Sequence, residues 1–321
     1  MTVVPLEAAD PARVGPLLAG AVSRVVLGKQ EAVRLVVAAV LAGGHVLLED
    51  APGVGKTLLA KALARTIGAP AGRVQGTPDL LPSDVTGVSV YEPGAEDPAR
   101  RWTFHPGPLF HHVLLVDEIN RATPRAQSAL LEAMQEGQVT VDGTTHALPV
   151  PFVVLATQNP EGDAGTFPLV PGQSDRFAVA VSLGLPSRDA ERALLLGEGG
   201  LPGLHELPAL VEPAALRAAQ AATGRLHAHP AIVEYVLDLV AATRQQPGLA
   251  HGVSPRAAQA LLAVARGHAC VDGRTWVLPD DVKAVAGPVL AHRLAAAGRT
   301  TTTAARRVVE DLVAAVPVPV A

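Results

Sequence analysis

A lysine and a threonine that follow a glycine-rich turn are the first residues able to do chemistry. Residues 45–57 read His-Val-Leu-Leu-Glu-Asp-Ala-Pro-Gly-Val-Gly-Lys-Thr. The apolar run 46–48 predicts a buried strand, the glycines predict a tight loop, and the apolar spacing after Thr57 predicts a helix. The N–H groups of such a loop and the positive end of its helix bind phosphate. Lys56 is then placed to reach the β- and γ-phosphates of a nucleotide, and Thr57 to ligate Mg²⁺.

The predicted phosphate-binding segment covers residues 50–58. It departs from the strict motif at one position, because Asp50 stands where that motif has its first glycine. We expect contacts to the nucleotide from all of its residues, namely Asp50, Ala51, Pro52, Gly53, Val54, Gly55, Lys56, Thr57 and Leu58. The pattern therefore predicts a site for a nucleoside triphosphate.

Two adjacent carboxylates form the second candidate group. Asp117 and Glu118 directly follow the apolar run 113–116, which predicts a buried strand. Carboxylates at the end of a buried strand cost free energy unless a cation meets them. We expect Asp117 to hold Mg²⁺ together with Thr57, and Glu118 to activate a water for attack on the γ-phosphate. The sequence therefore predicts Mg²⁺-dependent hydrolysis of a nucleoside triphosphate, for which the family resemblance given below implies ATP.

Two further polar residues are predicted to lie near the phosphates. Asn159 closely follows the apolar run 152–156, and ligands of open α/β sheets bind at the carboxyl ends of the strands. There it is placed to orient the attacking water. Arg256 follows Ser254 and Pro255, which predict the N-cap and first position of a helix. An arginine in the first turn opposes the positive helix end, so this position favours a nearby anion.

The elements that must position these residues fall into two parts. Residues 1–185 carry four apolar runs and the short stretch Arg-Val-Gln-Gly at 73–76, which together predict five strands. The strands alternate with helical patterns, which is typical of a parallel α/β sheet with helices on both faces. Two hairpins are predicted as insertions, near 88–104 and 139–148. We expect the first stretch of the chain, 1–20, to be weakly structured. Residues 186–321 carry only helical patterns, near 187–197, 213–223, 229–246, 254–270, 279–296 and 304–315.

Composition limits the class of protein. The chain has 321 residues, of which 49% are hydrophobic and 3% aromatic, so its core must be built from Ala, Val and Leu. The net charge of −4 does not favour a general nucleic-acid binder. Cys270 is the only cysteine, which excludes an intramolecular disulfide. Residues 1–16 lack a basic stretch and no apolar run reaches membrane length, so we expect a cytoplasmic protein without a membrane span.

The ordered set of motifs resembles the MoxR family of AAA+ ATPases over nearly the whole chain. Besides the phosphate loop, the resemblance rests on Gln-Gly-Thr-Pro-Asp-Leu-Leu-Pro-Ser-Asp-Val-Thr-Gly at 75–87, Pro-Gly-Pro-Leu-Phe at 106–110, Asp-Glu-Ile-Asn-Arg-Ala at 117–122, and on 127–136, 156–160 and 252–257. It implies a five-stranded parallel AAA+ core over 1–185 and a helical lid over 186–321. It also implies that Asn159 is sensor 1, Arg176 the arginine finger and Arg256 sensor 2.

The resemblance also implies partners. Members of the family act as ring-forming, chaperone-like ATPases, often with partners that carry a von Willebrand factor type A domain, and some assist maturation of metalloenzymes. It therefore implies a homo-oligomeric ring, such as a hexamer, with a partner of that kind and a client protein, and the two hairpins resemble inserts that face a pore or partner. On the residues alone, a DNA-translocating or helicase-type AAA+ motor and a non-hydrolysing scaffold stay open. The acidic net charge disfavours the first, and the intact Lys56 and Glu118 disfavour the second.

Two segments depart from the family pattern. Gly76 stands where an aromatic residue is usual. Leu-Val-Pro-Gly-Gln-Ser at 169–174 stands where relatives resemble Leu-Pro-Glu-Ala-Gln-Leu, just before the implied finger Arg176. Arg121 and Arg125 are therefore the alternatives for that role.

Overall fold

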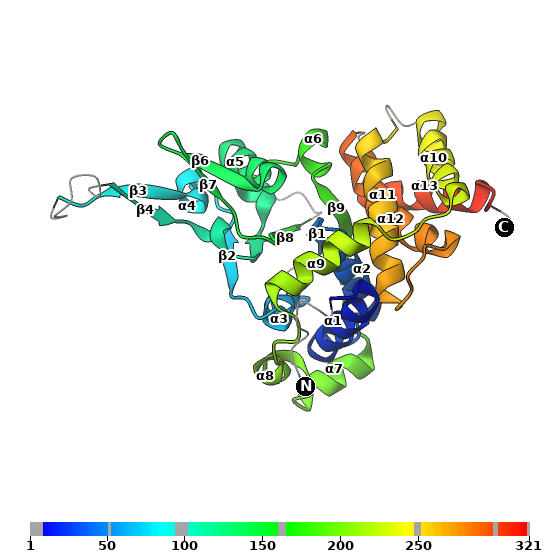
Figure 1. The fold of residues 1–321 in the computed structure, drawn as a ribbon, viewed down its shortest axis with the longest axis horizontal. Helices are drawn as coiled ribbons and strands as arrows, with labels where there is room; N and C mark the ends of the chain where they lie inside the picture. Colours follow the sequence, from blue (N-terminus) through cyan, green and yellow to red (C-terminus); the bar gives the residue numbers. More distant parts are fainter. Residues whose placement is uncertain are drawn as a thin grey trace.

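A five-stranded parallel sheet forms the centre of the molecule (Figure 1). The structure is a computed structural model that describes residues 9–50, 53–93, 102–159, 165–246, 252–297 and 301–319. The sheet has the order β2-β5-β8-β1-β9. Its strands are β1 (His45–Glu49), β2 (Ala71–Gln75), β5 (Val113–Asp117), β8 (Val153–Gln158) and β9 (Phe177–Val181). They overlap the five predicted strand segments, which confirms the predicted α/β fold class.

Alternation of side chains along the strands divides the core into two layers. One face packs on α1 (Pro11–Val25), α2 (Gln30–Leu41) and α3 (Lys56–Thr66), as well as on the C-terminal helices. The other face packs on α5 (Pro124–Glu136). The first face carries Val46, Leu48, Leu115, Leu155 and Val179, and the second carries Leu47, Leu114, Val116, Val154 and Ala180. Burial of both faces explains why β1, β5, β8 and β9 are continuous apolar runs, whereas the edge strand β2 alternates buried and exposed residues.

The prediction of a weakly structured start is wrong for the described part of residues 1–20. Helix α1 begins at Pro11, and Asp10 caps it by accepting from the Ala12 N–H at 2.9 Å. Gly15 and Pro16 inside the helix hid it from a propensity argument. Gly15 serves close packing, because a Cβ there would lie 2.6 Å from the carbonyl oxygen of Cys270.

Both predicted hairpins are present. The first consists of β3 (Gly87–Tyr91) and β4 (Trp102–Pro106), follows the short α4 (Pro82–Thr86), and projects from one end of the molecule (Figure 1). The second consists of β6 (Gln138–Val141) and β7 (Thr144–Ala147). Its turn residues Asp142 and Gly143 have φ values of 49° and 79°, as the predicted type I′ turn requires. Residues 94–101 of the first hairpin lie outside the described residues.

The C-terminal half is helical, as predicted. Each predicted stretch contains a helix, and α8 is an additional helix that Gly200, Pro202 and Gly203 concealed. The helices are α7 (Arg188–Leu195), α8 (Gly200–Glu206), α9 (Pro213–Gly224), α10 (Pro230–Gln245), α11 (Pro255–Val271), α12 (Pro279–Ala297) and α13 (Thr302–Ala315). Short turns complete the fold: η3 (Pro108–Phe110), η4 (Ile119–Arg121) and α6 (Pro171–Ser174). Among the described residues, no helix is long and apolar enough to cross a membrane.

Helix α11 packs tightly against the N-terminal helices. Its Gly267 lies so close to Ala38 of α2 that a Cβ would overlap the Ala38 carbonyl oxygen. The other neighbour is α1, which approaches the carbonyl of Cys270 through Gly15. The C-terminal helices therefore share one apolar core with α1 and α2. The division of the chain into domains at residue 185 stays a prediction.

The buried His45 makes the stability of this fold pH-dependent. Its Nδ1 accepts from the Val154 N–H at 3.1 Å, so the neutral ring carries its proton on Nε2, 3.2 Å from the Met134 carbonyl oxygen. Burial lowers the pKa of His45 from 6.5 to about 4, and the Met134 carbonyl opposes part of this shift. Because the folded pKa lies below the unfolded one, the stabilisation is complete above pH 6.5 and is lost as the pH falls towards 4.

We therefore expect His45→Gln, whose side chain cannot titrate, to reduce the fall in the free energy of unfolding as the pH is lowered. Between pH 7 and pH 4.5 the free energy of unfolding of the wild type should fall by about 2–3 kcal/mol more than that of the variant. Denaturant unfolding at both pH values measures this difference. The exposed His205 provides the control, since His205→Gln should run parallel to the wild type. A His45→Gln curve that also runs parallel would contradict the prediction.

Candidate nucleotide site

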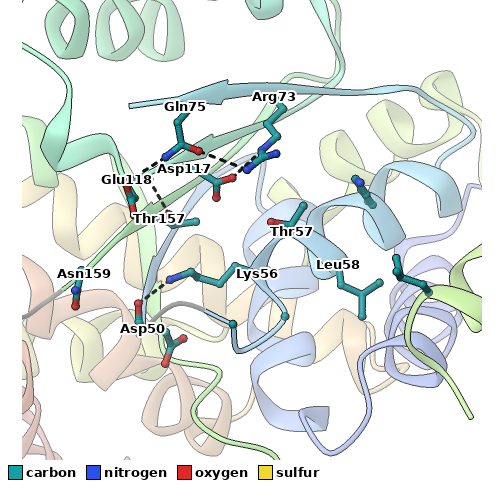
Figure 2. A pocket seen from close by; sticks show the side chains of 14 residues that line it. Asp50, Lys56, Thr57, Leu58, Arg73, Gln75, Asp117, Glu118, Thr157 and Asn159 are labelled. Atoms are coloured by element: carbon teal, nitrogen blue, oxygen red, sulfur yellow. Dashed lines mark hydrogen bonds and ion pairs between the residues drawn. The ribbon is translucent and has the colours of Figure 1, made fainter. Parts of the chain in front are cut away.

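A cavity of about 500 Å³ lies at the carboxyl ends of the sheet strands (Figure 2). It brings together most of the predicted site residues. Its lining consists of Asp50, Gly53, Gly55, Lys56, Thr57, Leu58, Lys61, Arg73, Gln75, Asp117, Glu118, Thr157, Asn159 and Leu201. Parallel strands direct their carboxyl ends to one edge, which is why segments far apart in sequence meet there.

The loop between β1 and α3 has the backbone of a phosphate-binding loop. Gly53 and Gly55 adopt φ values of 85° and 103°, which other residues rarely reach. Helix α3 begins at Lys56, and no side chain caps its first turn, so its N–H groups are oriented for an anion. Lys56 Nζ donates to the Asp50 carbonyl oxygen at 2.6 Å, and burial lowers the pKa of this lysine. The predicted contact residues 51–52 lie outside the described residues.

Asp50 has a role in the fold that explains the missing glycine. Its carboxylate accepts from Ser182 Oγ at 2.7 Å, from Leu183 N at 2.5 Å and from Gly184 N at 3.0 Å. These contacts tie the start of the loop to the segment that leaves β9. Asp50 therefore borders the cavity, but its carboxylate is directed at the protein backbone. Val54 borders a separate cavity of about 420 Å³ beside α7.

Asp117 and Thr57 suit a divalent cation. Asp117 is buried at the end of β5, and both residues line the same cavity. A carboxylate and a hydroxyl are oxygen ligands of the kind that Mg²⁺ prefers. The donor set therefore fits Mg²⁺. In the structure the carboxylate is paired with Arg73, whose Nε lies 2.8 Å from Asp117 Oδ2.

Glu118 is held in an unusual backbone conformation. Its φ and ψ values are 55° and 50°, in the left-handed region that residues other than glycine seldom occupy. The Glu118 N–H donates to Thr157 Oγ1 at 2.9 Å, and its carboxylate accepts from Gln75 at 3.2 Å and from Arg121 at 3.0 Å. Strain of this kind is typical of residues placed for function. Asn159 lines the same cavity from the end of β8.

Sequence reasoning missed Arg73, Gln75 and Thr157. Arg73 and Gln75 alternate along β2 with a buried valine between them, a pattern that predicts two polar side chains on one face. Thr157 is a buried hydroxyl two residues before Asn159. These patterns are visible in the sequence, but they place the three side chains at the cavity only once the order of the strands is known.

The close contacts of Gly76 explain why this chain has no aromatic side chain at position 76. Its N–H donates to the Asp117 carbonyl oxygen at 2.6 Å, and a Cβ on this residue would overlap the carbonyl oxygen of Glu118. The backbone of the strained Glu118 thus rests directly against Gly76. In this chain a side chain at position 76 has no space unless Glu118 moves.

We expect Gly76→Ala to lower ATP turnover about tenfold by displacing Glu118, with ATP affinity little changed. Steady-state phosphate release at saturating ATP, with binding measured in parallel, tests this expectation. Gly20→Ala is the control, because a Cβ at Gly20 meets no atom within 4 Å. Equal turnover in the two variants would show that Glu118 tolerates the added methyl group.

Arg176 and Arg256 do not line this cavity. Both line a second cavity, of about 460 Å³, together with Asp175 and Arg293. Arg176 donates to Gln135 Oε1 at 3.2 Å and to the carbonyl oxygen of Gly172 at 3.1 Å. The structure therefore separates the predicted site residues into two groups, one around Lys56 and Asp117 and one around the two arginines.

Asp175 connects the segment of Arg176 with the helix of Arg256. Its Oδ1 accepts from Arg293 Nε at 2.7 Å, and its Oδ2 accepts from Ser254 Oγ at 3.1 Å. Ser254 is the N-cap of α11 and accepts from the Ala257 N–H at 3.3 Å, as predicted from the Ser-Pro-Arg sequence.

The altered segment before Arg176 forms the short helix α6. Pro171 occupies its first position, and Gln173 Oε1 accepts from the Val170 N–H at 3.0 Å. Of the alternative arginines, Arg121 contacts Glu118 of its own chain, and Arg125 is exposed on α5.

Known proteins are similar to this chain in sequence and in fold. The model of the ATPase family associated with various cellular activities (AAA) matches residues 45–179, and that of the AAA lid domain matches 241–312. The chain is 43% identical over 310 residues to the uncharacterized protein YeaC of Bacillus subtilis, and the match covers 95% of this chain and 96% of YeaC. It is 40% identical over 282 residues to chaperone MoxR1 of Mycobacterium tuberculosis, covering 85% and 73% of the two chains.

Two solved structures have a similar fold. A candidate ATPase from Cytophaga hutchinsonii has a TM-score of 0.83 at 32% identity, covering 97% of this chain and 96% of the other. An MCM homolog from Methanopyrus kandleri has a TM-score of 0.58 at 21% identity, covering 93% and 64%, and shows a shared fold alone. Long matches to MoxR proteins, the AAA matches and the sheet with its nucleotide cavity lead to one conclusion: the chain belongs to the MoxR family of AAA+ ATPases.

Proposed function

We propose that this protein is a Mg²⁺-dependent ATPase that couples ATP hydrolysis in a ring of identical subunits to the remodelling or maturation of protein partners. The observation that carries the proposal is the shared cavity of Lys56, Thr57, Asp117, Glu118 and Asn159. These are the groups that ATP hydrolysis needs, and they converge from three strand ends. Phosphate release from ATP in Mg²⁺, and its loss in EDTA, tests the activity.

Each residue has a distinct task in this proposal. Lys56 and the start of α3 bind the phosphates, while Thr57 and Asp117 hold Mg²⁺, which when bound neutralises phosphate charge. Glu118 accepts a proton from the attacking water. Asn159 orients that water.

We assign Arg176 and Arg256 to the nucleotide of a neighbouring subunit. Their shared cavity is separate from the phosphate cavity of the same chain, which supports action between subunits. Positive groups that meet the γ-phosphate stabilise the charge of the transition state. The assignment requires a closed ring, for which a hexamer is the proposed form.

Protein partners are the proposed targets. The name of MoxR1 as a chaperone supports a protein client, and we propose a partner with a von Willebrand factor type A domain and a client such as a metalloenzyme, in the cytoplasm. The DNA-translocating alternative is not favoured, since the long matches are to MoxR proteins and the net charge is −4.

The β3–β4 hairpin is the proposed contact for the partner. It projects from the core, and its Tyr91 and Trp102 are 46% and 66% exposed, with ring centroids 5.2 Å apart. We expect replacement of residues 92–101 by a short glycine-containing turn to preserve basal ATP hydrolysis and to abolish coupling to a partner of the von Willebrand factor type A kind. A βαβ core does not need this insertion to bind ATP.

Partner-stimulated ATPase activity and pull-down measure this effect. A Gly-Ser loop of the original length is the matched control. It removes the side chains of the loop but keeps its length, so it distinguishes an effect of side-chain chemistry from an effect of shortening. Full stimulation and full binding in both variants would place the partner contact elsewhere.

A further inference from the structure

The carboxylate of Asp117 already has a cationic partner in the structure. Arg73 Nε donates to Asp117 Oδ2 at 2.8 Å. The Asp117 side chain is 11% exposed and that of Arg73 is 58% exposed, so the guanidinium reaches the buried carboxylate from the open side of the cavity. A buried carboxylate without a cation is costly, and this ion pair offsets part of that cost.

The edge strand β2 determines where Arg73 lies. Parallel pairing sets Gln75 opposite Asp117, and Arg73, two residues earlier, shares the face of Gln75 (Figure 2). Gln75 Nε2 donates to Glu118 Oε2 at 3.2 Å, and Gln75 Oε1 accepts from Arg73 at 3.4 Å. The two side chains of β2 thus engage the two carboxylates separately, with Arg73 on Asp117.

We propose that Arg73 is a built-in counter-ion of Asp117 that leaves the carboxylate when Mg²⁺ and nucleotide bind. The inference rests on the proposed function, which places Mg²⁺ on Asp117. A guanidinium and a divalent cation on one carboxylate repel each other, so Arg73 and the metal compete. The long and largely exposed side chain of Arg73 is able to move without disturbing its strand.

This exchange gives Arg73 an effect on metal affinity. In the nucleotide-free protein it keeps the buried Asp117 paired. When Mg²⁺ and nucleotide bind, the charge-assisted hydrogen bond between Arg73 and Asp117 is lost, and this loss lowers the affinity for Mg²⁺. Removal of the guanidinium should therefore strengthen the dependence of nucleotide binding on Mg²⁺, whereas loss of an ordinary phosphate contact should weaken nucleotide binding.

The test compares nucleotide affinity with and without Mg²⁺. A methylanthraniloyl derivative of a non-hydrolysable ATP analogue is titrated by fluorescence into the full chain, once in Mg²⁺ and once in EDTA. The enhancement factor is the Kd in EDTA divided by the Kd in Mg²⁺. We expect Arg73→Gln to raise this factor about tenfold, the effect of one charge-assisted hydrogen bond. Arg73→Lys, which keeps a charge but loses the Nε bond, should raise it about threefold and serves if the first variant does not fold.

Arg121→Gln is the matched control, because Arg121 contacts Glu118 rather than Asp117, at 3.0 Å. Its enhancement factor should stay within about twofold of the wild type. An unchanged factor for both Arg73 variants would show that the ion pair has no part in metal binding, and a reduced factor would show that Arg73 contacts the bound nucleotide. Either result overturns the inference. A wild type that binds no nucleotide would overturn the proposed function, and this inference with it.

Discussion

Replacement of Glu118 by Gln is expected to reduce ATP turnover about a thousandfold while ATP affinity changes by less than about threefold. Glutamine keeps the shape of the side chain and its hydrogen bonding to Arg121 through an amide oxygen, but it is unable to accept a proton from water. The phosphate loop, Lys56 and Thr57 are untouched, so the substrate should bind and remain. The expected phenotype is a stable ATP-bound protein.

Single-turnover phosphate release and equilibrium binding separate the two quantities. The exposed Glu132 on α5 supplies the control, since Glu132→Gln removes the same charge away from the cavity. Turnover by Glu118→Gln within tenfold of the wild type would remove Glu118 from the role of base. The trapped form is also suited to the isolation of a client, because slow hydrolysis prolongs any ATP-dependent complex.

Replacement of Arg176 by Ala is expected to lower turnover about a thousandfold with ATP binding preserved. ATP binding should be preserved because Arg176 and Lys56 line different cavities of the chain. Removal of the Arg176 side chain therefore leaves the phosphate loop of the same chain complete. Mixing Arg176→Ala with Lys56→Ala protein should restore part of the activity. A subunit with an intact phosphate loop then faces a neighbour with an intact arginine.

A second mixture controls for exchange without complementation. Lys56→Ala and Glu118→Gln both damage the phosphate cavity, so their mixture contains no complete site and should stay inactive. Recovery in neither mixture, in subunits shown to exchange, would contradict an arginine acting between subunits. Arg121 is the less suitable candidate, since it contacts Glu118 of its own chain.

The sequence was sufficient to predict that Lys56, Asp117 and Asn159 lie close together, because each follows the end of a strand. Asp117 and Asn159 each follow a buried apolar run, and the carboxyl ends of parallel strands meet at one edge. The ion pair of Arg73 with Asp117 was not predictable in this way, because it depends on which strand lies beside β5. Chain order alone does not supply that neighbour.

Contacts between distant segments account for the remaining misses. The carboxylate of Asp50 binds backbone N–H groups more than 130 positions later, at Leu183 and Gly184. Nothing in the local pattern around residue 50 points there. Likewise Arg176 and Arg256 share a cavity only because α11 packs beside β9, and an isolated helical pattern does not state its packing partner.

Two glycines, Gly15 of α1 and Gly267 of α11, set how closely α11 packs on the N-terminal helices. With Gly15 and Gly267 the backbones of α1 and α2 touch that of α11, and neither contact has space for even one methyl group. A rotation of α11 about its own axis would bring larger side chains into these two contacts, so we expect Arg256, in the first turn of α11, to keep its position relative to α1 and α2. In the proposed ring, a tilt of one subunit against the next would then move Arg256 together with α1 and α2.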